Sequence, residues 1–138
     1  MQWLDLLPHQ PPMRLLEEIV SVTPGEAAVG RRLAKAEDFY FQGHFPGDPI
    51  VPAVILVEMV AQAGGLAAGA PREGDAPRTL QLRVAAIGPF KFPAAARPGA
   101  VLEASARVVG SLGALYKIDG RVTADGIVVA SGSLTLAG

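Results

Sequence analysis

The stretch that decides the fold runs from Gly43 to Gly65 and reads GHFPGDPIVPAVILVEMVAQAGG. Its first half is predicted to be a loop, because glycine and proline recur in it. Pro52 suits the first turn of a helix, since proline has no N–H to leave without a partner. A helix is therefore predicted from Ala53. The residues expected to end it are Gly64, Gly65, Gly69 and Pro71.

Glu58 is the one charged residue in the first part of that helix. Residues 53–61 are otherwise apolar on every side, which is typical of a buried helix. Burying an ionised carboxylate is costly unless it is paired or protonated. One interpretation is a structural acid that Gln62, one turn further on, satisfies by a hydrogen bond. The other uses His44 from the loop as a base near neutral pH, with Glu58 holding a proton to donate.

The start of the helix adds a third chemical component. The N–H groups of Ala53, Val54 and Ile55 are expected to lack acceptors within the helix. With the positive end of the helix dipole, they could hold an oxygen that gains negative charge. A base, an acid and an oxyanion donor in one short segment suit the abstraction of a proton next to a carbonyl group.

At these residues the chain resembles the 3-hydroxyacyl-[acyl-carrier-protein] dehydratases, hotdog-fold enzymes of bacterial fatty acid synthesis. The central motif lies in residues 43–47, 52–55 and 58–62. Leu7-Pro8-His9 with Pro12, and Arg97-Pro98-Gly99, are similar to two less specific motifs of the family. The resemblance covers nearly the whole chain, which we interpret as one domain, residues 1–138. Glutamate at position 58 is similar to the branch of the family that does not isomerise its product.

The resemblance implies a reaction and a role for each residue. A (3R)-3-hydroxyacyl thioester, on acyl carrier protein or coenzyme A, would be dehydrated to the trans-2-enoyl thioester. His44 would take the C2 proton, and Glu58 would protonate the departing hydroxyl. Ala53, with Val54, would hold the thioester oxygen, and Gln62 would orient Glu58. No metal or cofactor is expected beyond the phosphopantetheine that the substrate carries.

The chain departs from the family in two places. Ala53 stands where the family usually has glycine, so the N–H is kept but a methyl group is added. Residues 92–96 replace a stretch that is usually more basic. Carrier proteins are acidic, so the basic side chains expected to meet one are Lys91, Arg97 and Arg83, each of which could equally be an ordinary surface charge.

His9 is the second histidine of the chain and stands among Pro8, Pro11 and Pro12. We interpret it as a structural histidine that hydrogen-bonds a loop, in preference to a catalytic role.

Two other functions fit a hotdog domain. A thioesterase also needs a carboxylate and an oxyanion donor, but the Gly-His-Phe-Pro-Gly motif of residues 43–47 argues against it. A non-catalytic acyl-binding subunit could keep the motif without turnover, although the intact pair of His44 and Glu58 disfavours this.

Composition excludes several classes of protein. The chain has 138 residues, is half hydrophobic, carries a net charge of −1 and contains no cysteine. The balanced charge argues against nucleic-acid binding. The absence of cysteine permits a reducing compartment, and we expect the cytoplasm. Residues 50–70 approach the length of a membrane span, but a central Glu58 makes that interpretation untenable.

The remaining pattern predicts strands over 13–22 and 26–33 before the helix. Four more are predicted after it, over 78–92 with a break at Gly88-Pro89, and over 101–109, 115–123 and 127–136. Asp125-Gly126 is a strong signal for a hairpin turn. This is an α+β domain in which an antiparallel sheet wraps a long central helix.

The helix also bears on assembly. One sheet covers only one side of a helix, so a helix apolar all round favours a homodimer. The resemblance adds that the active site lies at the dimer interface, with His44 from one subunit and Glu58 from the other. It is also compatible with a hexamer, a trimer of dimers.

Overall fold

The computed structural model describes residues 2–75 and 80–138. The chain begins with the short 3-10 helix η1 (Trp3–Leu6) and two strands, β1 (Glu18–Thr23) and β2 (Ala27–Leu33). A second 3-10 helix, η2 (Phe39–Phe41), and a loop lead into the long helix α1 (Ala53–Gly69). Four strands follow: β3 (Arg83–Lys91), β4 (Val101–Leu112), β5 (Leu115–Ala124) and β6 (Ile127–Ala137). The predicted α+β architecture is confirmed.

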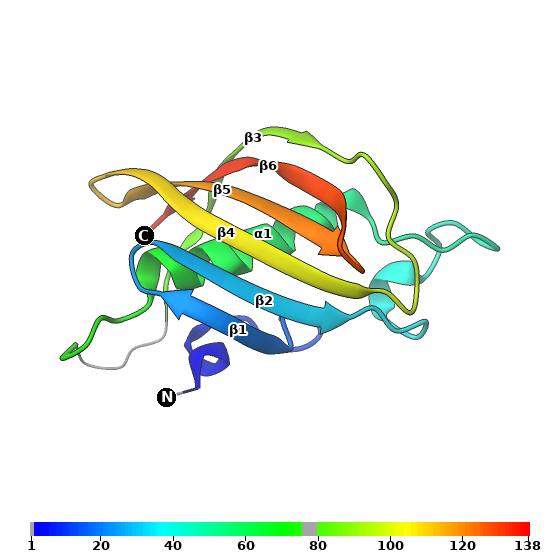
Figure 1. The fold of residues 1–138 in the computed structure, drawn as a ribbon, viewed down its shortest axis with the longest axis horizontal. Coiled ribbons are helices and arrows are strands. Elements are labelled where there is room, and N and C mark those ends of the chain that lie inside the picture. The colour runs from blue at the N-terminus through cyan, green and yellow to red at the C-terminus, as the bar shows by residue number, and fades with distance from the viewer. Residues whose placement is uncertain (1, 76–79) are drawn as a thin grey trace.

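The strands form one antiparallel sheet in the order β1-β2-β4-β5-β6-β3. The sheet curves over α1, and β4, β2, β5 and β6 supply most of the strand contacts of the helix (Figure 1). Alternate side chains of the central strands face the helix, and Leu102, Ile118 and Leu134 among them are almost fully buried. The core therefore lies between the inner face of the sheet and α1.

Helix α1 follows the prediction in length but not in every detail. Pro52 is expected in the first turn, but with φ −58° and ψ 142° it is not helical and stands at the N-cap, one residue before the helix begins. Gly64 and Gly65 do not end the helix, which continues to Gly69. A Cβ on Gly64 would stand 3.0 Å from Ile118 Cγ2, so this glycine lets the helix approach the sheet closely.

The largest difference between the observed and the predicted strands is at the first strand. Residues 13–17 lie outside the sheet, and β1 begins only at Glu18. Positions 78 and 79 of the predicted third strand lie outside the described residues, and β3 begins at Arg83. Its register shifts between Ile87 and Phe90, which confirms the break expected at Gly88-Pro89. The β5–β6 turn has positive φ at both Asp125 and Gly126, as the hairpin signal predicts.

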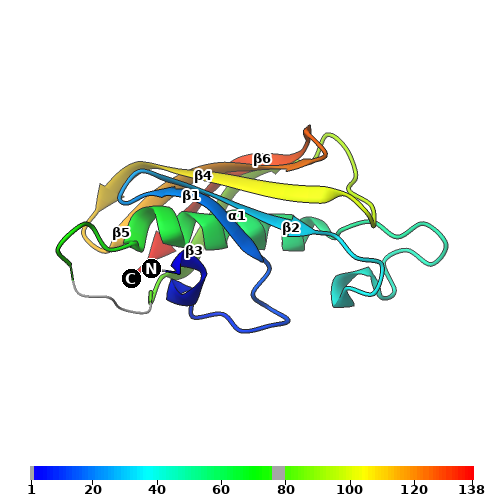
Figure 2. The same cartoon turned by 60° about the horizontal axis from the view of Figure 1, so that its bottom comes forward.

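The residues before β1, numbers 2–17, are called the N-terminal segment. They lie on the side of α1 opposite the sheet, as Figure 2 shows from below. Gln62 of α1, itself 1% exposed, holds this segment. Its Oε1 accepts from the N–H of Leu15 (2.9 Å), and its Nε2 donates to the carbonyl of Met13 (2.8 Å). The N-terminal segment thus covers part of α1 that the sheet cannot reach.

Strands β1 and β3 form the two edges of the sheet. Along β3, Ile87 is 61% exposed although it is a large apolar side chain. The first turn of α1 is also open, with Val54 73% exposed. No helix within residues 2–75 and 80–138 has the length and hydropathy needed to cross a membrane.

Candidate active site

Glu58 lies in a polar cluster on the face of α1 that the N-terminal segment crosses. Its Oε2 accepts a hydrogen bond of 2.9 Å from Gln62 Nε2, which confirms that these two side chains meet. The same oxygen lies 3.3 Å from His9 Nε2. In the single chain the Glu58 side chain is 25% exposed, so it stands at the margin of the core rather than inside it. The interpretation of α1 as apolar and buried on all sides is therefore wrong for this face.

His44 lies in the loop that leads to α1, and a contact with the backbone of the same loop fixes the orientation of its ring. Nδ1 is 3.1 Å from the carbonyl oxygen of Ile50. A carbonyl oxygen only accepts, so this contact places the proton on Nδ1 and leaves the lone pair on Nε2. The backbone N–H of Ile50 donates in turn to the carbonyl of His44 (3.1 Å), which closes the loop on itself. An imidazole held in this tautomer is ready to accept a proton at Nε2.

The structure does not bring His44 and Glu58 together within one chain. The polar contact of the His44 ring is with Ile50, and those of Glu58 are with Gln62 and His9. The loop that carries His44 extends beyond the start of α1, away from the sheet (Figure 1). Phe45, next to it, is 54% exposed.

The start of α1 supplies fewer unpaired N–H groups than predicted. The N–H of Ile55 has no acceptor within α1, as expected, but it donates to the carbonyl of Pro52 just before the helix (3.0 Å), so it is not available to hold another oxygen. In the described chain the N–H groups of Ala53 and Val54 have no backbone acceptor. Both residues are exposed, and their N–H groups stand at the positive end of a helix of 17 residues. These two N–H groups are therefore the candidate oxyanion donors.

An apolar hollow of about 260 Å³ adjoins this helix start. Its lining comes from the loop, from the first turn of α1 and from the connection between β3 and β4. The lining residues are Ile50, Val51, Ala53, Leu56, Phe92, Ala94, Ala95 and Ala96. The alanines of residues 94–96 thus help to shape an apolar space beside the N–H groups at the start of α1.

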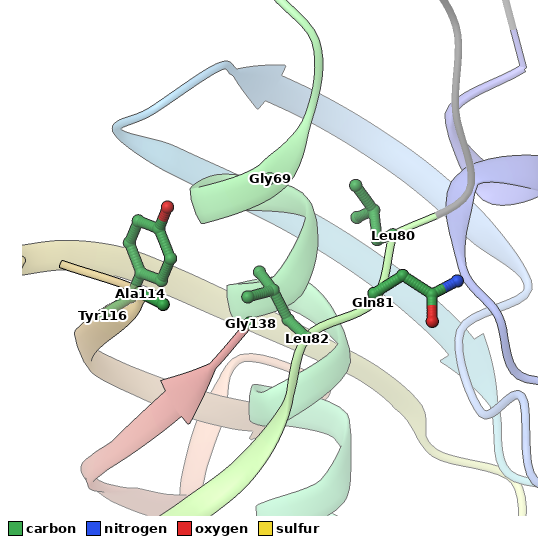
Figure 3. Close-up of a pocket in the computed structure, with 7 residues that line it drawn as sticks. All are labelled: Gly69, Leu80, Gln81, Leu82, Ala114, Tyr116 and Gly138. Carbon is green, nitrogen blue, oxygen red and sulfur yellow. The ribbon is translucent and has the colours of Figure 1, made fainter.

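A second hollow, of about 230 Å³, lies at the other end of α1. Figure 3 shows the side chains of Leu80 and Leu82 and the ring of Tyr116 around the last helical residue, Gly69. Since α1 has 17 residues, about 25 Å of helix separates this hollow from Ala53. It is therefore remote from the helix start and from His44.

Asp38 anchors the polypeptide that precedes the His44 loop. Its carboxylate accepts from the backbone N–H of Lys35 (2.9 Å) and from the hydroxyl of Tyr40 (2.8 Å), and it lies 2.9 Å from the guanidinium of Arg32. Burial opposes the ionisation of Asp38, but these hydrogen bonds outweigh it and hold the pKa of Asp38 below its usual value. Arg32 also donates to the carbonyl of Leu15 (3.1 Å). One ion pair therefore supports both the loop and the N-terminal segment.

His9 is the site residue that sequence reasoning missed. Its Nε2 faces Glu58, and its Nδ1 is buried with no hydrogen-bond partner among the described residues. The interpretation of His9 as a histidine that bonds a loop is therefore wrong. The only signal in the sequence was the weak motif Leu7-Pro8-His9, because the contact joins irregular backbone to a helix far along the chain. Within residues 2–75 and 80–138, no group of three or more His, Cys, Asp and Glu side chains is arranged to hold a metal ion.

Comparison with solved structures identifies the class of fold. A chain of the dehydratase heterocomplex ApeI:P from Xenorhabdus doucetiae superimposes with a TM-score of 0.80 at 20% identity, covering 99% of this chain and 90% of that one. The Escherichia coli PaaI protein superimposes with a TM-score of 0.67 at 17% identity, covering 88% and 82% of the two chains. The fold is the hotdog fold, a long helix wrapped by an antiparallel sheet.

Sequence comparison is more specific. Residues 7–133 match the FabA-like domain. A protein named 3-hydroxyacyl-[acyl-carrier-protein] dehydratase FabZ from Myxococcus xanthus is 34% identical over 129 residues, which cover 94% of this chain and 84% of that protein. A protein of the same name from Roseiflexus castenholzii is 35% identical over 134 residues, covering 97% and 92%. The chain belongs to the FabA-like family, together with these FabZ proteins.

Proposed function

We propose that the protein dehydrates a (3R)-3-hydroxyacyl thioester to the trans-2-enoyl thioester in fatty acid synthesis. Family membership supports this reaction, because relatives that match most of the chain are named as dehydratases of this kind. The observation that carries the chemistry is the hydrogen bond from Gln62 to Glu58, which presents a carboxyl group at the edge of the core. A carboxylic acid that is partly exposed, and that has one oxygen held by a hydrogen bond, is suited to protonating a leaving hydroxyl.

The reaction needs one base, one acid and one oxyanion donor. His44 Nε2 takes the proton from C2, and the electron pair of the C–H bond moves toward the thioester carbonyl. The charge that develops on the thioester oxygen is held by the N–H of Ala53, with that of Val54. The C3–O bond then breaks as Glu58 donates its proton to the hydroxyl, which leaves as water. The enolate electrons return to form the C2–C3 double bond, so atoms and charge balance.

A second copy of the chain would complete this site. His44 and Glu58 do not meet within one chain, and the loop that carries His44 points away from the body of the molecule. The surfaces open to a partner are apolar: Phe45 on the loop, Val54 on the helix start and Ile87 on the edge strand β3. We therefore propose a homodimer in which β3 pairs with its own copy and His44 of one protomer faces Glu58 of the other, compatible with a hexamer of three such dimers.

The substrate is proposed to arrive on acyl carrier protein, with its phosphopantetheine as the only prosthetic group involved. Arg83 and Lys91 bound β3 and are the cations proposed to meet an acidic carrier. Arg97 is already paired with Asp48, whose Oδ1 lies 3.2 Å from Arg97 Nε, so it contributes less free charge. The cytoplasm, expected from the sequence, is the proposed location.

The test is hydration of a crotonyl thioester, followed as loss of enoyl absorbance. Glu58→Gln keeps the shape of the acid without its proton, and His44→Ala removes the base. Each should lower turnover by roughly 10²- to 10⁴-fold while leaving the urea midpoint near that of the unaltered protein. Full activity in either variant would remove that residue from the mechanism. Release of free thiol in an amount equal to the enoyl thioester consumed would favour the thioesterase alternative, whereas hydration consumes the enoyl thioester without releasing thiol.

A further inference from the structure

His9 and Gln62 approach the same oxygen of Glu58. Gln62 Nε2 donates to Oε2 over 2.9 Å, and His9 Nε2 lies 3.3 Å from it. The other oxygen, Oε1, has no hydrogen-bond or ion-pair partner within the described chain. The two oxygens of the carboxyl group are therefore in different surroundings, and the difference is set by side chains of the same protomer.

The position of His9 is fixed on both sides along the chain. Before it, the carbonyl of Leu6 accepts from the N–H of Leu80 (2.9 Å). After it, Met13 and Leu15 are bonded to the side chain of Gln62. The N-terminal segment runs along the side of α1 opposite the sheet (Figure 2). The backbone around His9 is irregular, but hydrogen bonds hold it on both sides.

The surroundings of the His9 ring select its tautomer. Nδ1 is buried without a partner, and Nε2 faces a carboxyl oxygen. A proton on Nδ1 would be a buried donor with no acceptor among the described residues. A proton on Nε2 avoids that cost and faces Oε2, which can accept it. His9 therefore presents an N–H, as Gln62 does, to Oε2.

This arrangement locates the proton that Glu58 gives away. A protonated carboxyl group accepts at its carbonyl oxygen and donates from its hydroxyl oxygen. Oε2 faces two N–H groups, so it is the carbonyl oxygen, and the acidic proton stands on Oε1. We propose that His9 is a positioning residue which, with Gln62, keeps the transferable proton of Glu58 on Oε1, directed away from the N-terminal segment. This rests on the role of Glu58 as the acid in the proposed function.

The experiment compares substitutions at position 9 in the full chain, with crotonyl thioester hydration as the assay. His9→Ala should lower kcat by about 10- to 100-fold, the loss that a small misplacement of a catalytic group causes, with little change in KM. His9→Gln, whose Nε2 reaches as far as that of histidine, should recover most of the activity. His9→Asn, which is one methylene shorter, should not. Gln10→Ala, at an exposed neighbouring position, is the matched control and should retain full activity.

A double-substitution cycle separates positioning from general damage. If His9 acts through Glu58, His9→Ala should cause no further loss in a Glu58→Gln background. The inference is overturned if His9→Ala keeps the original kcat, if the glutamine and asparagine variants behave alike, or if the losses at positions 9 and 58 multiply. If urea unfolding shows that His9→Ala does not fold, the difference in kcat between His9→Gln and His9→Asn tests the inference instead. If instead Glu58→Gln is fully active, the proposed acid itself is wrong.

Discussion

Gln62 donates from one amide nitrogen to two acceptors, Glu58 Oε2 at 2.9 Å and the carbonyl of Met13 at 2.8 Å. Its Oε1 accepts from the N–H of Leu15 at the same time. Nearly all the hydrogen-bonding capacity of this buried side chain is used, and it couples the acid to the N-terminal segment.

Replacing Gln62 by leucine should therefore damage stability and turnover together. The N–H of Leu15 would lose its acceptor in a buried place, which we expect to lower the free energy of unfolding by about 1–3 kcal/mol. The same change frees Glu58, so kcat should fall as well. Urea unfolding and the hydration assay measure the two effects. Gln81→Leu, at an exposed position, is the control; a similar loss there would argue against a specific role for Gln62.

If the site is shared between protomers, two inactive variants should complement each other. A heterodimer of His44→Ala and Glu58→Ala chains has one site with both substitutions and one with neither. Random co-assembly by co-expression should therefore restore about a quarter of the original activity, since half of the dimers are mixed and each has one intact site. No recovery in dimers shown by mass spectrometry to be mixed would place both residues in the same protomer's site.

The edge strand β3 offers a test of the dimer itself. Ile87→Asp puts a charge on an exposed apolar edge, which should block strand pairing and shift the protein toward the monomer. Ile127→Asp is a matched control, because Ile127 is 63% exposed, against 61% for Ile87, but starts β6 at a hairpin turn. Sedimentation velocity measures whether each variant is a monomer or a dimer. Equal dissociation by both variants would mean that β3 is not the contact.

Asp38 predicts a pH dependence of stability. Its pKa is lower in the folded than in the unfolded protein, so its contribution is complete above the unfolded value of about 3.9 and is lost as the pH falls through the folded pKa. Asp38→Asn should be less stable near neutral pH and should lose less stability between pH 5 and pH 2. Urea midpoints over that range measure this. Glu37→Gln, an exposed neighbour, should leave the slope of the original protein unchanged.

Gly120 on β5 is a site of close approach between the sheet and α1. A Cβ there would collide with Val60 Cγ1 and stand 2.8 Å from the carbonyl oxygen of Ser105, a backbone atom that cannot move aside. We expect Gly120→Ala to cost about 1–3 kcal/mol of unfolding free energy. Gly110→Ala has no atom within 4 Å of the added Cβ and should be neutral. Equal unfolding midpoints for the two variants would contradict the role of close packing.

Much of the fold could be predicted because local patterns agree with tertiary structure. The hairpin at Asp125-Gly126 depends on two residues that accept positive φ, and the structure has both there. The start of α1 at Ala53 follows from Pro52 and the apolar run after it. The prediction that the first strand begins at Met13 is wrong because Met13 and Leu15 bond the side chain of Gln62 rather than a neighbouring strand. Hydrophobic alternation carries no information about that kind of partner.

The site was predictable only in part, for a similar reason. Glu58 and Gln62 are one helical turn apart, so spacing alone brings them together. Met13 and Gln62 are 49 residues apart, and the segment that holds His9 has no repeating pattern. The position of His9 against Glu58 depends on the path of that segment over the helix. The expectation that Gly64 helps to end the helix is wrong because its close contact with Ile118 of the sheet cannot be distinguished in sequence from a helix end. Gly65 makes no such contact, and nothing in the structure explains a glycine there.

Part of the proposed chemistry of this protein is encoded outside its regular architecture. The six strands and α1 build the scaffold, and α1 also carries Glu58 and Gln62, whereas the proposed base and the histidine beside the acid lie on irregular backbone, before α1 and before β1. The two irregular segments can therefore change in evolution while the sheet wrapped around α1 is kept. Hotdog relatives that have drifted to different reactions should differ first there, and an engineer seeking new activity would begin by exchanging these segments rather than by redesigning the sheet.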